Sequence, residues 1–402
     1  MVTAGIAAEY NPFHSGHAHL IEKARAREGL GATHVVAVMS GHFVQRGAPA
    51  VLPKAERVRM ALAGGADVVI ELPAPWALSS AEGFARGCVS LLEALGCVDA
   101  MAFGSECGDV DKLAKLANLM DSPRFGELLR YRMSGGLSYP EAQQKALEEL
   151  TGPSAASLLE GANNTLGVEY IRAMTSLRPF TVPRAGAEHD SEIPLDGLAS
   201  ASLLRKMIAA GRLTEAARYM PADCRPILVN AAEQGLCPAS EQRAERALLA
   251  RLRLLTAADF AALPAISEGL ENRLYAASRE ATSYEDLIDR IKTKRYPRTR
   301  VQRAVWCAYL GITAEDAAGL PPYVRVLGMT EKGLDVLRSA RENCPLPIIT
   351  RASQAETLTG QARRIWELEA QAADLYALAL PKPFACGREY TAGLIKYEPK
   401  GI

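Results

Sequence analysis

The sequence is poor in cysteine, carries no excess of charge and contains no long apolar run. Its 8 cysteines are scattered without any C-x-x-C pair, which excludes a zinc ribbon and a disulfide framework and predicts buried free thiols. No apolar run approaches the roughly 18 residues of a membrane-spanning helix, and the first residues lack the basic segment of a signal peptide. We therefore expect a cytoplasmic protein without a membrane partner. Because the 46 basic residues balance 46 acidic ones, any nucleic acid must be bound by a local basic patch.

Histidine is also rare, and its distribution is uneven. All but one of the 6 histidines lie in the first 42 residues. Since histidine is the side chain most often tuned for work near neutral pH, we expect the catalytic chemistry in the N-terminal half. His19 and His34 are expected to be structural, and no role is assigned to His42 or His189.

The length of 402 residues exceeds that of a usual single domain and predicts two, residues 1–208 and 209–402. In the first, strands alternate with helices, which is typical of a Rossmann-like, doubly wound parallel α/β sheet. Beyond residue 208 the chain is rich in Ala, Leu, Arg and Glu, which predicts a mainly α-helical C-terminal domain. The last part is expected to hold short strands near 323–328 and 347–350 and a helix over 357–380.

The most informative stretch is the turn between the first strand, predicted over residues 2–8, and the first helix. It places His14 and His17 three residues apart, on one face of the first helical turn, and Gly16 between them lets a ligand approach the backbone. A helix N-terminus favours anions, so a nucleotide phosphate suits this site. A zinc pair or two surface histidines would be the alternatives. The position directly after the first strand of an α/β domain favours the ligand site.

Three more segments supply candidate ligand contacts at strand ends or helix starts. The loop after the second strand offers Gln45 and Arg46 as contacts to nucleotide or substrate, although a solvated loop would have the same composition. Gly104 follows a predicted strand and would let a base or ribose lie against bare backbone. At a later helix start, small hydroxyl residues and an arginine form a candidate anion site. The alternative is that the hydroxyl residues only cap the helix and the arginine lies on the surface. These residues are Ser200, Ser202 and Arg205.

Residues 290–303 contain seven basic side chains and no acid in an otherwise neutral chain. A run of charge is usually a solvated face. Arginine nevertheless dominates here, as suits phosphate recognition, and Tyr296 is placed to stack on a base. We therefore predict RNA contact, and the candidate RNA-binding residues are Lys294, Arg295, Tyr296, Arg298 and Arg300.

The block Gly5–His17 reads G-I-A-A-E-Y-N-P-F-H-S-G-H and ends in H-x-G-H, the signature of the HIGH-type nucleotidyltransferases. As a whole it resembles the bacterial tRNA(Met) cytidine acetate ligase family, whose first strand and turn run G-I-x-x-E-Y-N-P-F-H-x-G-H. Further segments are similar to that family, among them residues 40–50, 70–73, 103–106, 163–167, 189–190 and 294–303. His42 stands where the family is expected to carry a small polar residue such as Asn, and Ala199 replaces the first residue of the I-S-S-T-x-I-R-like motif.

The resemblance implies ATP-dependent activation of acetate to acetyl-adenylate, with release of pyrophosphate. The N4 amine of the wobble cytidine (C34) of elongator tRNA(Met) would then take the acetyl group, forming N4-acetylcytidine. His14 and His17 would be catalytic, and Mg²⁺ would arrive with ATP rather than at a metal site of the protein. The implied ATP contacts are Gly5, Ile6, Ala7, Ala8, Glu9, Tyr10, Asn11, Pro12, Phe13, His14, Ser15, Gly16, His17, Ala18, Gly104, Asn163, Asn164, Arg184, Ala185, Ser200, Ser202 and Arg205.

Two other functions stay open. A small-molecule nucleotidyltransferase would share the His14/His17 site, but it would not need about 190 further residues with a basic run. A non-catalytic RNA-binding protein could keep a degenerate nucleotide fold. Pyrophosphate exchange that depends on acetate distinguishes the ligase from both.

Overall fold

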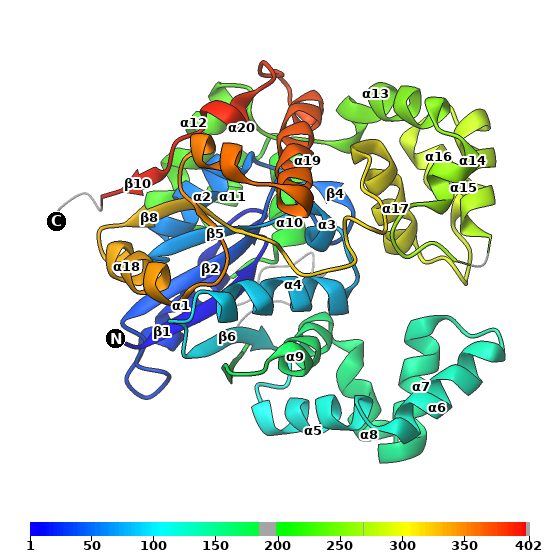
Figure 1. The fold of residues 1–402 in the computed structure, drawn as a ribbon, viewed down its shortest axis with the longest axis horizontal. Helices are drawn as coiled ribbons and strands as arrows, with labels where there is room; N and C mark the ends of the chain where they lie inside the picture. The colour runs from blue at the N-terminus through cyan, green and yellow to red at the C-terminus, as the bar shows by residue number, and fades with distance from the viewer. Residues whose placement is uncertain (185–197, 268, 399–402) are drawn as a thin grey trace.

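The computed structural model describes residues 1–184, 198–267 and 269–398. Among these residues a mixed sheet runs through the molecule in the order β10-β8-β5-β2-β1-β6-β7, with β9 paired to β8 off this path (Figure 1). A separate hairpin joins β3 to β4. The strands are β1 (Thr3–Ala8), β2 (His34–Ser40), β3 (Phe43–Val44), β4 (Ala48–Pro49), β5 (Val68–Leu72), β6 (Ala100–Ser105), β7 (Arg178–Pro183), β8 (Val324–Thr330), β9 (Ile348–Ile349) and β10 (Ile395–Tyr397).

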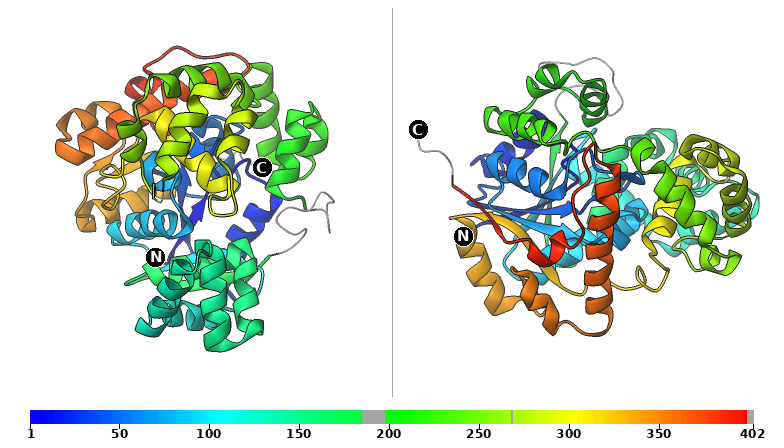
Figure 2. Two further views of the ribbon diagram at one scale, coloured as in Figure 1. Left: turned by 90° about the vertical axis from the view of Figure 1, so that its right-hand side faces the viewer. Right: turned by 90° about the horizontal axis from the view of Figure 1, so that it is seen from above.

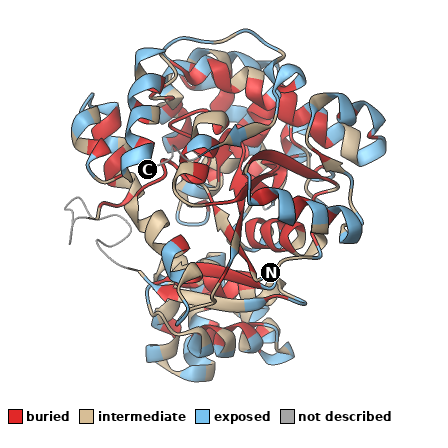
Figure 3. Cartoon of the chain, turned by 90° about the vertical axis from the view of Figure 1, so that its left-hand side faces the viewer, coloured by how far each residue is buried: buried red, intermediate tan, exposed pale blue. Residues whose placement is uncertain are grey.

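The middle of the sheet is parallel, with β1 lying between β2 and β6. Both faces are covered by helices, which explains why β2 and β5 are almost wholly buried and mostly apolar (Figure 3). Alternate residues of β2 enter two different cores. Val36 and Val38 pack with the face that carries α4, whereas Val35 and Ala37 pack with the face that carries α1 and α2.

The helices that cover the sheet belong to these two faces. On the α4 face lie α4 (Ala81–Ala94), α9 (Ala162–Ala173) and α18 (Gly333–Asn343). The opposite face carries α1 (Ser15–Arg25), α2 (Lys54–Ala63), α10 (Ala201–Ala209), α11 (Leu213–Ala217), η2 (Ala222–Cys224) and α12 (Arg225–Glu233). Shorter or peripheral elements are α3 (Ala74–Ala77), η3 (Ala352–Thr357), α19 (Gly360–Tyr376), η4 (Ala377–Ala379) and α20 (Arg388–Thr391).

Two helical groups extend from the sheet (Figures 1 and 2). The first follows β6 and contains α5 (Val110–Met120), α6 (Pro123–Ser134), α7 (Tyr139–Thr151), α8 (Pro153–Ala156) and η1 (Ser157–Glu160). The second, called the helical unit below, contains α13 (Glu241–Leu254), α14 (Ala257–Ala261), α15 (Leu270–Glu280), α16 (Tyr284–Ile291) and α17 (Arg298–Leu310). The sheet and the helices that cover its two faces are called the sheet unit below. The helical unit meets it through α17, where the buried Trp306 lies 5.2 Å from the Phe43 ring, centroid to centroid.

The predicted division at residue 208 is wrong as a division of the sheet. The run 324–330 is buried on both faces and pairs antiparallel with β5, and β10 pairs with β8 in turn. Helix α12 packs against α2, and residues of α11 and α12 belong to the same core as β1. The helical prediction applies to residues 241–310, where the described residues form helices and no strand.

Across the part of the chain that the structure describes, no helix combines the length and the hydropathy needed to cross a bilayer.

Candidate functional site

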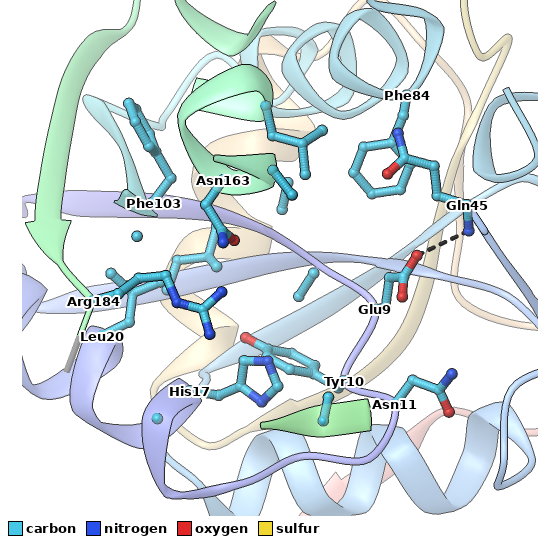
Figure 4. A pocket seen from close by; sticks show the side chains of 18 of the residues that line it. Glu9, Tyr10, Asn11, His17, Leu20, Gln45, Phe84, Phe103, Asn163 and Arg184 are labelled. Atoms are coloured by element: carbon cyan, nitrogen blue, oxygen red, sulfur yellow. Dashed lines mark hydrogen bonds between the residues drawn. The ribbon is translucent and has the colours of Figure 1, made fainter. Parts of the chain in front are cut away.

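A cavity of about 660 Å³ lies at the ends of β1, β6 and β7, where the N-termini of α1, α9 and α10 meet (Figure 4). Parallel strands present their carboxyl ends at one edge of a sheet, so this is the place where α/β folds bind ligands. The cavity therefore lies where the position of the histidine pair predicts it.

His14 and His17 are built into the first turn of α1. The Nδ1 atom of His14 accepts a hydrogen bond from the N–H of Gly16 at 3.0 Å, and Nδ1 of His17 accepts one from the N–H of His14 at 3.2 Å. The two rings stack with centroids 3.8 Å apart. In a neutral imidazole one nitrogen accepts and the other carries the proton. Each ring is thereby fixed in the tautomer whose donor is Nε2–H.

Both imidazoles are held neutral. Burial lowers the pKa of His14 to about 3, and Arg184 and Arg205 act in the same direction. Burial, the neighbouring His14 and Arg184 hold the pKa of His17 well below its ordinary value. The pair therefore presents hydrogen-bond donors, not charges, and the charge of the site comes from arginine.

Two guanidinium groups approach the histidines. Arg184 directly follows β7 and lines the cavity beside Gly104, and burial lowers its pKa. Arg205, on α10, donates from Nη1 to the carbonyl oxygen of Asn11 at 2.9 Å, which ties α10 to the turn before α1. Two cations, two Nε2–H donors and a helix N-terminus in one cavity form a site for phosphate groups.

The two asparagines at the start of α9 have different positions and roles. Glu106 accepts hydrogen bonds from the backbone N–H groups of Asn163 at 3.1 Å and Asn164 at 2.6 Å, and also from the Asn163 amide at 2.6 Å. Asn163 lines the cavity. Asn164 lies beneath it, where its side chain bonds the backbone of Cys107 and Leu158. Asn164 is therefore a residue that shapes the turn.

The structure brings most of the predicted site residues into the cavity. Those that line it are Ile6, Ala7, Ala8, Glu9, Tyr10, Asn11, His14, Gly16, His17, Gln45, Arg46, Gly104, Asn163, Arg184 and Arg205. Those that do not are Gly5, Pro12, Phe13, Ser15, Ala18, Asn164, Ser200 and Ser202. Ala185, like His189, lies outside the described residues.

The residues of the second set do not line the cavity, and their contact with ATP stays a prediction. Phe13 is fully buried under Gly64, and Gly5 lies against Leu92. Ser15 donates its hydroxyl to the carbonyl of Tyr219 at 2.9 Å. Ser200 is the N-cap of α10 and accepts from the N–H of Leu203 at 3.2 Å, while the Ser202 hydroxyl lies 2.9 Å from that of Ser200.

Several lining residues were missed in the sequence. His19, for which a structural role is expected, lines the cavity. Phe84, Phe103 and Tyr170 supply aromatic surface from three separate elements, and no sequence signal distinguishes them from ordinary core residues. Arg303, on α17, also lines the cavity. Its signal was available, since it is the last basic residue of the 290–303 run.

The basic run is only partly open to a ligand. Lys294 and Arg295 are exposed. Arg298 pairs with Glu285 at 2.5 Å and with Asp289 at 3.7 Å. Arg300 donates to the carbonyl oxygen of Ala265 and to the Ser267 hydroxyl.

Tyr296 is 5% exposed, and the guanidinium of Arg300 lies 5.5 Å from its ring centroid. The prediction that Tyr296 offers its ring to a base is therefore wrong for this fold, because packing buries the ring.

His42 lies away from the cavity, in a buried charged cluster. Its ring stacks on Tyr376 with centroids 4.4 Å apart, and Nε2 lies 3.9 Å from Glu389. Burial lowers its pKa to about 4. Lys54 pairs with Glu71 at 2.7 Å and with Glu389 at 2.8 Å in the same cluster. This cluster joins α20 to the sheet unit.

The residues that the structure describes contain no group of three or more His, Cys, Asp or Glu side chains placed to hold a metal ion. The cavity offers mainly nitrogen donors and cations, whereas Mg²⁺ prefers oxygen ligands.

The fold and the HIGH-type site define a nucleotidyltransferase, and residues 1–389 match the family model described as HIGH Nucleotidyl Transferase. A ligase of Acetivibrio thermocellus named tRNA(Met) cytidine acetate ligase is 36% identical over 98% of this chain and 100% of its own length. One of the same name from Fervidobacterium nodosum is 33% identical over 96% of both chains. This chain belongs to the tRNA(Met) cytidine acetate ligase family, as the Gly5–His17 block predicts.

The solved structures agree. Thermotoga maritima TmcAL in its apo form is 31% identical and superposes with a TM-score of 0.92 over 99% of this chain and 100% of that one. A second crystal form of that protein, bound with alpha-thio ATP, gives a TM-score of 0.90 at 30% identity. The predicted Rossmann-like fold is confirmed.

Proposed function

We propose that this chain activates acetate with ATP to acetyl-adenylate and transfers the acetyl group to N4 of the wobble cytidine of elongator tRNA(Met). Membership of the family makes it an ATP-dependent tRNA cytidine acetate ligase. The observation that carries the proposal is the convergence of two Nε2–H donors, from His14 and His17, with Arg184 and Arg205 in one cavity.

The chemistry of the first step suits these residues. When an acetate oxygen attacks the α-phosphorus of ATP, negative charge grows on the phosphate oxygens, and catalysis is mainly positioning and electrostatic stabilisation. The imidazoles are neutral at physiological pH, so each donates a hydrogen bond through its single N–H, at Nε2. Arg184 and Arg205 balance the charge. Mg²⁺ would enter on the triphosphate, whose oxygen atoms are the ligands that this ion prefers.

The tRNA would be captured by the helical unit. Lys294 and Arg295 are exposed beside α17, and α17 contributes Arg303 to the cavity. The phosphate-binding surface and the reaction site would thus lie on adjoining elements. A reaction on cytoplasmic tRNA would place the enzyme in the cytoplasm.

Acetate-dependent exchange of labelled pyrophosphate into ATP tests the first half-reaction. Mass spectrometry of tRNA(Met) after incubation with ATP and acetate tests the second. The proposal expects both exchange and a cytidine heavier by one acetyl group. Exchange with another acid or nucleotide, but not with acetate, would favour a small-molecule nucleotidyltransferase, and tRNA binding without exchange would favour a non-catalytic RNA-binding protein.

A further inference from the structure

The cavity has two chemically different halves. In Figure 4 the side chains of His17, Arg184 and Asn163 lie on one side, and those of Glu9, Gln45 and Phe84 lie on the other. The first half is cationic and donates hydrogen bonds, as phosphates require. The second half contains a carboxylate, which would repel a phosphate. The two halves are therefore suited to different substrates, and Glu9, for which the resemblance implies a contact with ATP, belongs to the half away from the phosphate-binding side chains.

Glu9 is held in the second half by both its main chain and its side chain. The buried guanidinium of Arg57 donates from Nη1 to the carbonyl oxygen of Glu9 at 2.6 Å, and also to that of Ser40 at 3.1 Å. One carboxylate oxygen, Oε1, accepts the backbone N–H of Gln45 at 2.8 Å. Among the described residues, no other hydrogen bond or ion pair is made by this carboxylate, so Oε2 remains available to the cavity.

The helical unit closes this half of the cavity. A Cβ atom on Gly47, two residues after Gln45, would lie 2.5 Å from the backbone nitrogen of Arg303, so the loop and α17 are in close contact there. Burial lowers the pKa of the Arg303 guanidinium, and within the described part of the chain no acidic side chain pairs with it. The basic run thus leads from the exposed Lys294 and Arg295 to a cation at the cavity, which suits the phosphates of an RNA.

We propose that the half of the cavity formed by Glu9, Gln45, Phe84 and Arg303 receives the nucleotide that is acetylated, and that Glu9 accepts the proton of its exocyclic amine. An amine conjugated to a nucleobase is a weak nucleophile, so removing a proton as it attacks accelerates the step. Glu9 is the one acidic side chain among the described residues that line the cavity, so Oε2 is the carboxylate oxygen that can take this proton.

Atoms and electrons balance in this step. The N4 nitrogen forms a bond to the acetyl carbon of acetyl-adenylate, and the bond from that carbon to the phosphate oxygen breaks. AMP leaves with the electron pair, and one amine proton passes to Glu9 and then to water. This inference rests on the proposed function and adds a group that acts only in the second half-reaction.

The test measures the two half-reactions separately in the Glu9→Gln variant. Glutamine keeps the shape of the side chain and an oxygen that accepts the Gln45 N–H, but it cannot take up a proton. Glu22→Gln, at an exposed position of α1 outside the cavity, is the matched control. For both variants, three quantities are measured: acetate-dependent exchange with the KM for ATP and for acetate, the Kd for tRNA(Met), and single-turnover transfer from enzyme-bound acetyl-adenylate to tRNA(Met).

We expect Glu9→Gln to slow transfer by about 10²-fold or more, the scale of one general base, while exchange, both KM values and the Kd stay within about threefold of the parent. Glu9→Asp, which retains a carboxylate, should transfer faster than Glu9→Gln. Parental transfer by Glu9→Gln would overturn the inference. A raised KM for ATP with slowed exchange would also overturn it, since Glu9 would then belong to the ATP half. If the parent itself shows no acetate-dependent exchange, the proposed function fails first.

Discussion

Because His17 accepts a hydrogen bond at Nδ1 and donates one from Nε2, substitutions at this position should change stability and catalytic rate by different amounts. Asparagine at position 17 places its carbonyl oxygen near the position of Nδ1, where it can accept the N–H of His14, but it has no donor at the position of Nε2. Glutamine reaches the position of Nε2 with an amide N–H. Alanine supplies neither. The three variants therefore remove different parts of the same imidazole.

The magnitudes follow from the hydrogen bonds. Removing one donor to a transition-state oxyanion costs roughly 10²- to 10³-fold in rate, or about 2.7–4 kcal/mol. Removing the acceptor for the His14 N–H costs about 1 kcal/mol of stability, the value of a helix cap. For a chain of 402 residues unfolding as one unit, this corresponds to a fall in Tm of about 1 °C.

The assays are acetate-dependent pyrophosphate exchange and thermal unfolding. Exchange should fall in the order parent, His17→Gln, His17→Asn, with His17→Ala equal to His17→Asn. The Tm should be lower in His17→Ala than in His17→Asn. If His17→Gln exchanges no faster than His17→Asn, Nε2–H is not the donor. If His17→Asn matches the parent, His17 is not catalytic.

Replacing the exposed Lys294 and Arg295 by Ala should leave pyrophosphate exchange unchanged but weaken tRNA(Met) binding. The log–log slope of the binding constant against salt concentration should fall by about one for each RNA phosphate that is no longer neutralised. Filter binding across salt concentrations measures this slope, and an unchanged slope refutes the prediction. Tyr296→Ala should lower stability by about 3–5 kcal/mol, as expected for a buried aromatic side chain, and denaturant unfolding measures it. A parental unfolding midpoint with weakened tRNA binding would instead restore Tyr296 as a base contact. Burial would raise the pKa of Glu389, but the neighbouring Lys54, His42 and Arg325 have the larger effect and hold this pKa well below its ordinary value of 4.5. Its stabilising contribution is therefore present at neutral pH and is lost as the pH falls below that value, so Glu389→Gln should lower the unfolding midpoint at neutral pH more than at about pH 4; an equal loss at both would contradict the pKa direction.

The parallel part of the sheet could be predicted from the sequence because its strands are apolar on both faces and alternate with helices. The site could be located because His14 and His17 follow the first of these strands. Arg184 is predicted as a site residue from the resemblance to the family, and Arg205 from the pattern at a helix start. Both residues line the cavity in the structure.

What could not be predicted depends on contacts between distant residues. Nothing local to residues 324–330 shows that they pair with β5, since a short, mostly apolar strand also suits a separate small sheet. The same limit applies to Phe84, whose neighbours on α4 are core residues. It also applies to Tyr296, where composition indicates a base contact and packing buries the ring.

The helical unit lies between two segments that both belong to the sheet unit, α12 before it and β8 after it. It is therefore joined to the sheet unit by two chain crossings, unlike a domain carried on a single linker, and it shares one hydrophobic core with the sheet. Both features hold the helical unit in one position relative to the cavity. An RNA bound at α17 would consequently meet the cavity from one fixed side, so that chain connectivity contributes to the orientation of the substrate.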